Sequence, residues 1–255
     1  MRFFFEIAYL GTRYNGWQTQ PNGTGVQEVV EDGLKKIFRR RIPITGSGRT
    51  DTGVHCDQQF FHADLELENA SQQKLADLTH QLNSLLPRDI AIRSIRQVKP
   101  DTSARYDART RTYRYTITLR KDPLLTGHAL HVFKPLDVKK MQAAADILLG
   151  THDFECFSKV KTDVNHFECT IKAARWQQRG HLLVFTITAN RFLRGMVRAV
   201  VGTLLDVGTG KISVSDFAAV ISSRNRAKAG MNVAPEGLCL TKVTYRKGIF
   251  LTPAD

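Results

Sequence analysis

The 255-residue sequence has only four cysteines, at positions 56, 156, 169 and 239, and they are scattered. So few thiols in a chain of this length argue against a disulfide framework. No stretch approaches the roughly 18 apolar residues that a membrane span needs, and the apolar start MRFFFEIAYLG is interrupted by Glu6. We therefore expect a cytoplasmic protein with no membrane association.

Several nucleotide and metal signatures are also absent. The stretch GSGRTDTG lacks the Gly-Lys-Ser/Thr ending of a P-loop and the GxGxxG spacing of a dinucleotide site, and the P-C-x-x-C motif that base deaminases need does not occur. No CxxC occurs either. The pairs His152-x3-Cys156 and His166-x2-Cys169 have tolerable spacing for zinc, but Cys156 lies in DFECF, a stretch typical of core packing. We expect no metal ion. A zinc-dependent nucleic-acid protein that uses these four residues is kept as an alternative hypothesis.

Charge of one sign is in excess. Lys and Arg number 37 against 24 Asp and Glu, which gives a net charge of +13. Such a surplus favours a polyanionic partner, most often nucleic acid, although a basic surface without a specific partner has the same composition. The 42% hydrophobic content is ordinary for a folded globular chain.

In the first hundred residues, segments with the hydrophobic period of a strand alternate with segments that have the period of a helix. This pattern predicts strands at 2–9, 58–65 and 90–98 and helices at 25–40 and 71–86. Thr24 and Gln27 have the spacing of a capping box at the start of the first helix. We interpret this half as the ferredoxin-like order β-α-β-β-α-β.

The remaining sequence resembles the first half in outline. It predicts strands at 109–119, 171–178, 182–189 and 238–246, and helices at 137–149, 192–207 and 214–222. The periodicity breaks near KPDTSARY at 99–106, so we expect an N-terminal half, 1–105, and a C-terminal half, 106–255. The predicted class is α+β, with two ferredoxin-like halves sharing a mixed, mainly antiparallel sheet and a central basic cleft.

The stretch GSGRTDTGVH at 46–55 holds a carboxylate in a glycine-rich loop. Asp51 follows Arg49 by two residues, and a carboxylate beside an arginine suits nucleophilic attack. The glycines at 46, 48 and 53 allow a ligand to approach the backbone closely. The alternative is a turn aspartate that bonds its own backbone.

The segment DARTRTYRYTITLR interleaves basic and aromatic residues. As a strand it has one face made of Arg109, Arg111, Tyr113, Tyr115, Ile117 and Leu119. Arginine and tyrosine on one face suit RNA, because guanidinium groups hold phosphates and rings stack on bases. The alternative is a sheet with core tyrosines and an exposed charged end. Trp17, in YNGWQTQ, is likewise either a stacking platform or a loop anchor.

A second basic stripe lies in ANRFLRGMVRAVVG. In the predicted helix Arg191, Arg194 and Arg198 stand at i, i+3 and i+7 and share one face beside buried apolar residues. Arginines in that position favour an anion, either a phosphate or a carboxylate. A solvated face with three arginines is the alternative.

These segments together resemble one family. GRTDTGVH at 48–55 is similar to the signature of the TruA-type tRNA pseudouridine synthases, and the similarity extends along nearly the whole chain. The blocks that carry it, in the family's order, are YLGTRYNGWQ with GVQEVVE, LNSLLPRDIAI, SARYDARTRTYRY, ANRFLRGMVRAVVG and PEGLCL.

The resemblance implies the pseudouridine synthase fold and the isomerisation of uridine to pseudouridine in the anticodon stem-loop of tRNA, at positions 38, 39 and 40. It implies no metal, redox cofactor or ATP, and a homodimer. Asp51 matches the family's catalytic aspartate, and Arg49 the arginine that holds the flipped-out nucleotide or fills its place. Tyr113 matches the tyrosine that stacks on the base, Arg198 the arginine that pairs with the aspartate, and Leu238 the aliphatic residue that closes the base pocket.

Two positions depart from the family pattern. Thr52 stands where alanine is common, and Cys56 where a small residue is usual. To the implied site we add Arg109, Arg111, Arg191 and Arg194 as RNA-binding candidates, because they belong to the two basic stripes. A non-catalytic RNA-binding protein that uses the same basic cleft is the competing hypothesis.

Overall fold

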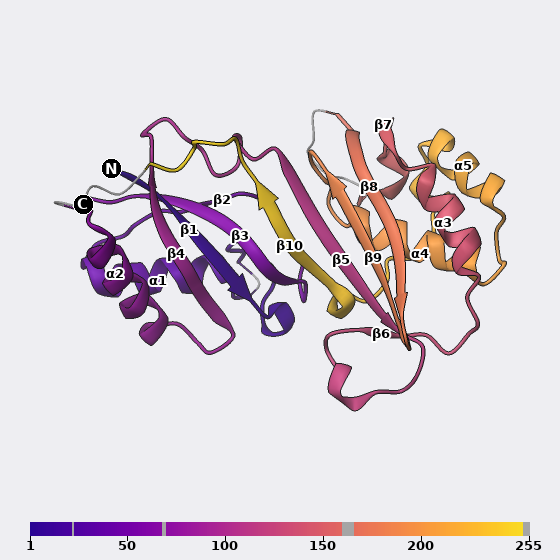
Figure 1. The fold of residues 1–255 in the computed structure, drawn as a ribbon, viewed down its shortest axis with the longest axis horizontal. Helices are drawn as coiled ribbons and strands as arrows, with labels where there is room; N and C mark the ends of the chain where they lie inside the picture. The colour runs from indigo at the N-terminus through magenta and orange to yellow at the C-terminus, as the bar shows by residue number, and fades with distance from the viewer. Residues whose placement is uncertain (22, 68–69, 160–165, 252–255) are drawn as a thin grey trace. The chain divides into compact units, whose positions relative to one another are not determined.

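The computed structural model describes residues 1–21, 23–67, 70–159 and 166–251. The chain forms two compact units, Met1–Arg109 with Leu240–Asp255 and Thr110–Cys239. Both units combine helices and strands (Figure 1), which confirms the α+β class expected from the sequence. Among the described residues no helix is long and apolar enough to cross a membrane.

The first unit has the ferredoxin-like element order. Its elements are β1 (Arg2–Tyr9), α1 (Val26–Phe38), β2 (Thr45–Gly46), β3 (His55–Asp64), α2 (Gln72–Leu85) and β4 (Ile90–Val98). Strand β1 pairs with β4 and β3, and β2 pairs with β3, all antiparallel, so the strands lie in the order β4-β1-β3-β2. The sixth element of the β-α-β-β-α-β pattern is therefore β2, whose two residues are too few to give a periodic signal.

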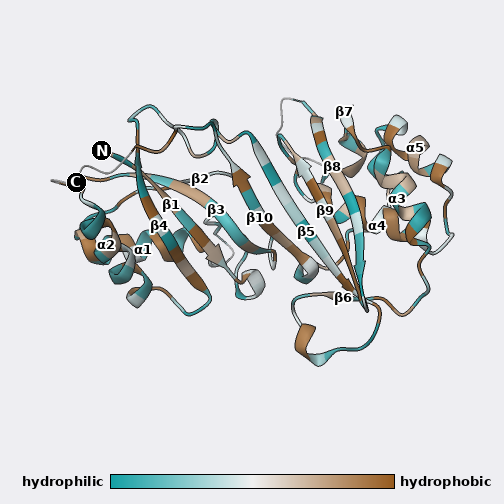
Figure 2. Cartoon of the chain, in the orientation of Figure 1, coloured by the Kyte–Doolittle hydropathy of each residue, from teal (hydrophilic) through white to brown (hydrophobic). Residues whose placement is uncertain are grey.

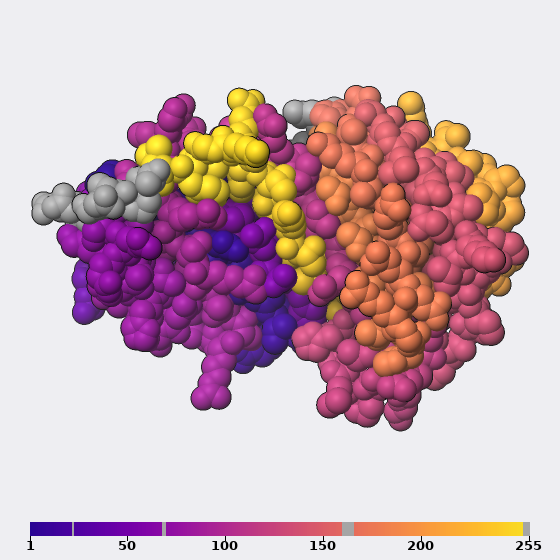
Figure 3. Space-filling model, viewed as in Figure 1, coloured from indigo at the N-terminus to yellow at the C-terminus, as the bar shows by residue number. Residues whose placement is uncertain are grey.

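Both faces of β1 are buried. Phe3, Phe5 and Ile7 are fully buried on one face, and Phe4 is buried on the other. The ring of Phe4 meets those of Tyr245 and Phe250, at 5.2 and 6.0 Å between centroids. These two residues follow β10 (Leu238–Thr244), and Figure 3 shows the yellow C-terminal segment lying on the surface of the first unit. The end of the chain thus completes the first unit's core.

Helix α1 is not capped as the sequence predicted. The residue before it makes no side-chain capping bond, and its first two amides donate to the carbonyls of Gly16 and Trp17, at 3.1 and 2.8 Å. The side chain of Gln27 donates instead to Glu31, at 2.9 Å. The capping box of Thr24 and Gln27 is therefore wrong, because carbonyls of a preceding loop already accept the amides that a cap would satisfy.

The second unit also packs helices with a sheet. Its elements are β5 (Thr110–Thr118), β6 (Leu130–His131), α3 (Val138–Asp146), β7 (Gly150–Asp153), β8 (Glu168–Arg179), β9 (Leu182–Ala189), α4 (Met196–Gly208) and α5 (Val214–Ser223). Strands β5, β9, β8 and β7 are antiparallel neighbours, and β6 pairs with β5 in parallel. The sheet is mixed and mainly antiparallel, as predicted.

The second unit's core lies between this sheet and its helices. Along β9 Leu183, Phe185 and Ile187 are fully buried and alternate with partly exposed residues. Figure 2 shows brown, hydrophobic segments along this strand. Helix α4 is buried along most of its length and contacts α3 and α5. Short 3-10 helices complete the chain: η1 (Gly11–Arg13), η2 (Pro123–Leu125), η3 (Glu155–Phe157), η4 (Arg226–Lys228) and η5 (Pro235–Gly237).

Candidate active site

Asp51 lies at a tight turn between β2 and β3. Its carbonyl accepts the amide of Val54 at 3.1 Å, and the turn contains Gly53 at a φ of +78°, a conformation that glycine adopts without steric cost. The side chain of Asp51 is partly exposed, and that of Arg49 is exposed. The turn therefore presents a carboxylate that is neither buried in the core nor fully solvated.

The residue before Asp51 is fixed from two sides. The Thr50 hydroxyl shares a hydrogen bond with that of Tyr9 at 2.8 Å, and the Thr50 carbonyl accepts the amide of Trp17 at 3.2 Å. A Cβ on Gly16 would lie 2.3 Å from the Thr50 carbonyl oxygen, so only glycine fits there. The opening loop, 11–18, thus holds the backbone next to Asp51.

Further bonds hold the two ends of the turn. The side chain of Gln59, fully buried, donates to the carbonyl of Gly48 at 3.2 Å. The amide of Gly53 donates to the carbonyl of Tyr14 at 3.3 Å, and the Nδ1 of His55 accepts the amide of Gly11 at 3.0 Å. His55 is buried and holds the opening loop, so its ring serves the scaffold of the turn.

The structure changes the interpretation of two residues of this region, Gly46 and Trp17. A Cβ on Gly46 would lie 2.5 Å from the Trp17 indole nitrogen, so Gly46 makes room for that ring; a Cβ on Gly48 would meet nothing within 4 Å. Trp17 is 2% exposed and packs near Phe61. Of the two roles left open for Trp17, the structure supports the loop anchor, because a buried ring offers no surface on which a base can stack.

A carboxylate at the start of β4 anchors the opening loop in turn. Asp89 accepts the Nε of Arg13 and the hydroxyl of Tyr14, each at 2.7 Å. Burial, followed by the bond to Asp89, raises the pKa of Tyr14 to about 12. Burial acts to raise the pKa of Asp89, but the bonds from Arg13 and Tyr14 outweigh it and the pKa of this carboxyl is lowered.

The two departures from the family pattern differ in surroundings. Thr52 is exposed at the turn. Cys56 is buried on β3, and its thiol lies 3.9 Å from the carbonyl of Ile7 on β1. Cys56 therefore belongs to the packing beneath the turn, and Thr52 to its outer surface.

The predicted Arg–Tyr face of β5 divides into two parts. Tyr115 and Ile117 are fully buried, and the Tyr115 hydroxyl donates to the carbonyl of Ala234 at 2.8 Å, so for this part the core interpretation is correct. Tyr113 is 9% exposed, and its ring meets that of Phe192 edge to face at 5.1 Å. Tyr113 is thus at the boundary between the core and the accessible end of the strand.

The three-arginine face predicted for helix 192–207 does not exist. Helix α4 begins at Met196, because Gly195 before it has a φ of +72°, which is outside helical geometry. Arg191 precedes the helix in irregular backbone, Arg194 lies in the turn that leads into it, and only Arg198 lies on the helix. The Nη1 of Arg191 contacts the His166 ring at 2.9 Å, so a tertiary contact replaces the predicted helical turn.

Arg198 is held by a segment that the sequence interpretation did not single out. Its Nε donates to the carbonyl of Val233 at 2.7 Å, and its own carbonyl accepts the Val233 amide at 3.3 Å. After η5 the chain enters β10 at Leu238, which is 4% exposed. The only sequence signal near Val233 is a non-periodic stretch that contains glycine and asparagine, AKAGMNV.

The other basic candidates, Arg109 and Arg111, lie at the start of β5. Arg109 is exposed, and Arg111 donates from Nη1 to the carbonyl of Asn190 at 2.9 Å. In the part of the chain that the structure describes, no three His, Cys, Asp or Glu side chains are grouped to hold a metal ion. Burial raises the pKa of Cys156 to about 12 and that of Cys169 to about 11.

Comparison with known proteins identifies the family. A family model described as tRNA pseudouridine synthase matches residues 7–107 and 144–246. The chain belongs to the tRNA pseudouridine synthase family. The tRNA pseudouridine synthase A of Porphyromonas gingivalis is 47% identical over 98% of this chain and 99% of its own length, and that of Bacteroides fragilis is 46% identical over 98% of each.

More distant members match over the same length. The tRNA pseudouridine synthase A of Exiguobacterium sibiricum is 37% identical over 97% of this chain and 99% of its own. A chain in a crystal structure of a Cbf5-Nop10-Gar1 complex matches with a TM-score of 0.36 and 15% identity, over 80% of this chain and 45% of that one. The latter likeness is too weak to bear on fold or function.

Proposed function

We propose that this protein isomerises uridine to pseudouridine in the anticodon stem-loop of tRNA, at positions 38, 39 and 40. The observation that carries the proposal is the chain's membership of the tRNA pseudouridine synthase family together with Asp51 at a turn fixed on both sides. The net charge of +13 supports a polyanionic substrate. The protein is an isomerase, so the atoms of the substrate are conserved in the product.

The reaction needs one bond broken and one formed. The N-glycosidic bond between N1 of uracil and C1′ of ribose breaks, the base turns, and C5 is joined to C1′; C5 loses a proton and N1 gains one. Asp51 is the nucleophile that attacks the nucleoside; the bond that its carboxylate forms is broken again before pseudouridine is released, so the enzyme is regenerated. A uridine within a stem must first leave the stack, which costs a few kcal/mol.

Each remaining site residue has a proposed part in that sequence. Arg49, exposed beside Asp51, holds the flipped-out nucleotide or fills the place it leaves. Tyr113 stacks on the uracil, Leu238 closes the base pocket, and Arg198 pairs with the Asp51 carboxylate. A ring and an aliphatic side chain around the base exclude water and favour rejoining over hydrolysis.

The wider contacts are also proposals. Arg109, Arg111, Arg191 and Arg194 contact the RNA backbone, which contributes affinity with little dependence on sequence. The family resemblance supports a homodimer acting in the cytoplasm without a metal or other cofactor. Light scattering of the purified protein tests the dimer.

The decisive experiment compares the protein with its Asp51→Asn variant on unmodified tRNA transcripts, with pseudouridine mapped at single-nucleotide resolution. We expect modification at positions 38–40 by the protein and none by the variant, with tRNA binding changed less than about threefold because the substitution conserves size. Activity of the variant near that of the parent would refute Asp51 as the nucleophile. Binding by both proteins without any modification would favour the competing hypothesis, an RNA-binding protein that is not an enzyme.

A further inference from the structure

A short irregular segment, residues 229–234, crosses helix α4 of the second unit at very close range. A Cβ on Gly202 of the helix would lie 1.9 Å from the Met231 carbonyl oxygen, and a Cβ on Gly230 would lie 2.8 Å from the Thr203 amide nitrogen. Neither position can carry a side chain without moving backbone. The two glycines therefore let the segment lie directly on the helix.

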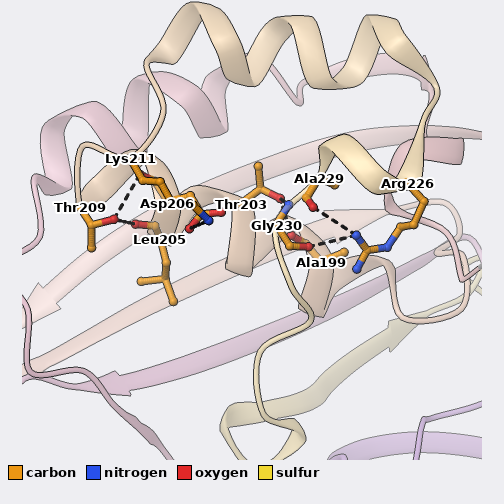
Figure 4. Close-up of polar contacts among 9 residues, drawn as sticks. All are labelled: Ala199, Thr203, Leu205, Asp206, Thr209, Lys211, Arg226, Ala229 and Gly230. Atoms are coloured by element: carbon orange, nitrogen blue, oxygen red, sulfur yellow. Dashed lines mark hydrogen bonds and ion pairs between the residues drawn. The ribbon is translucent and has the colours of Figure 1, made fainter.

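The crossing is fastened by a buried hydroxyl. Thr203 is fully buried; its Oγ1 accepts the amide of Gly230 at 2.8 Å and donates to the carbonyl of Ala199 at 2.8 Å. Figure 4 shows Thr203 of the helix beside Gly230 of the segment. Because a buried amide without a partner costs free energy, the contact fixes the register of the segment on α4.

The same segment determines the direction of Arg198. Val233 exchanges two bonds with Arg198, accepting its Nε at 2.7 Å and donating its amide to the Arg198 carbonyl at 3.3 Å. A guanidinium whose Nε is bound in this way presents its two Nη groups in one direction, and it loses less side-chain entropy when it meets a carboxylate. The bond of Tyr115 to the Ala234 carbonyl holds the segment's other end.

A further side chain, that of Arg226, also binds the 229–234 segment. Arg226, in η4, donates from Nη1 to the carbonyls of Ala229 and Gly230, at 3.3 and 3.0 Å, and from Nη2 to the Oδ1 of Asn232 at 2.9 Å. Figure 4 shows the guanidinium reaching both carbonyls. A planar fork with several fixed donors is suited to hold an irregular backbone in one conformation.

We propose that Arg226 is a positioning residue for the isomerisation: it fixes the 229–234 segment, which in turn aims the guanidinium of Arg198. Arg226 touches neither the nucleotide nor Asp51 in this role, and its effect on the reaction passes through Val233 and Arg198. The inference rests on the proposed function only in taking Arg198 as part of the site.

The first test measures the positioning itself and requires no activity. In ¹⁵N NMR spectra of the whole protein, with the Arg198 Nε signal assigned by its loss in Arg198→Lys, solvent exchange of that Nε–H reports its bond to Val233. We expect Arg226→Ala to speed this exchange about tenfold or more, since a protecting bond is weakened. The control Lys228→Ala removes an exposed cation from the same turn and leaves the exchange unchanged. Unchanged exchange in Arg226→Ala overturns the proposal.

The second test is a double-mutant cycle on tRNA transcripts. We expect Arg226→Ala to lower kcat about tenfold, as for loss of hydrogen bonds from a charged donor, with KM changed less than about twofold. Arg226→Lys keeps the positive charge but lacks the planar guanidinium, so its kcat should lie between those of the parent and of Arg226→Ala. If the alanine variant does not fold, the lysine variant takes its place in the cycle. In an Arg198→Ala background the same substitution should add less than about twofold. A full tenfold loss in both backgrounds shows a general structural role and overturns the proposal.

The two tests separate the possible failures. Absence of pseudouridine with the parent protein refutes the proposed function, and the exchange measurement still decides whether Arg226 positions Arg198. Activity in the parent with full activity in Arg198→Ala removes Arg198 from the site and overturns the inference with it.

Discussion

The Asp51 turn of the first unit and the 229–234 segment of the second are both irregular, and both hold a charged side chain, but they differ in what fixes them. The Asp51 turn is fixed by several bonds distributed around it, from Tyr9, Trp17, Gln59 and Tyr14. The first part of the 229–234 segment depends on one crossing of a helix and one arginine, and its end is held at Val233 and Ala234 by Arg198 and Tyr115. The first arrangement is redundant, whereas the second concentrates its stability in a few groups.

The largest effect should come from the glycine at the crossing. Gly202→Ala places a methyl group 1.9 Å from the Met231 carbonyl oxygen, so the backbone of the segment must move. We expect the free energy of unfolding to fall by about 3 kcal/mol or more, and kcat to fall as Arg198 loses its support. Urea unfolding and turnover of tRNA transcripts measure the two.

A helical glycine in the first unit is the matched control. A Cβ on Gly33 of α1 would meet the side chains of Leu86 and Leu82 at 3.5 and 3.6 Å, which is ordinary contact. Gly33→Ala should therefore raise the free energy of unfolding by about 0.5–1 kcal/mol, since alanine favours a helix more than glycine does. Equal losses in both variants would contradict the assignment of Gly202 to a close crossing.

The next largest loss of stability is expected from substitution of two threonines: Thr203, which binds the 229–234 segment, and Thr50, which holds the Asp51 turn. Thr203→Val leaves the buried amide of Gly230 without its acceptor and should cost about 1–3 kcal/mol. Thr50→Val removes one bond to Tyr9, whose hydroxyl still reaches Gln59 at 3.4 Å, and should cost about 1 kcal/mol or less. Urea unfolding of both variants tests whether the Asp51 turn is the more redundant; a larger loss in Thr50→Val would reverse the comparison.

Sequence patterns predicted regular elements and the Asp51 loop well, because burial has a period and a glycine-rich loop with one carboxylate is unusual. They placed the start of α4 too early, since the residues of RFLRG suit a helix and only the observed φ of Gly195 excludes one. They assigned Thr24 and Gln27 to a cap because backbone carbonyls of the preceding loop, which accept the first amides of α1, leave no trace in the sequence pattern. The 229–234 segment was missed for the same reason: its bonds are to backbone atoms, which every residue has.

Acid should weaken the support of the Asp51 turn through Asp89. The folded-state pKa of this carboxyl is lowered, because the bonds from Arg13 and Tyr14 outweigh the effect of burial. Its stabilising contribution is therefore complete above the unfolded pKa of about 4 and is lost as the pH falls through the lower folded value. We expect Asp89→Asn to lower the free energy of unfolding at pH 7 by about 1–2 kcal/mol, and to make its dependence on pH below about 5 flatter. Thermal unfolding across that range measures both; an unchanged slope would show that other carboxyls dominate.

The smallest effects should come from Thr52 and Cys56, the two departures from the family pattern. Thr52 is exposed, so Thr52→Ala should change the free energy of unfolding by less than about 0.5 kcal/mol. Cys56→Ala removes one buried sulfur beside Ile7 and should cost about 1 kcal/mol, with kcat changed less than about twofold because the bonds at Thr50 and Gly48 remain. Urea unfolding and tRNA turnover of the two variants check this. A large fall in kcat for Cys56→Ala at nearly unchanged stability would mean that the packing beneath the turn sets the position of Asp51, and that the surrounding bonds are less redundant than their number implies.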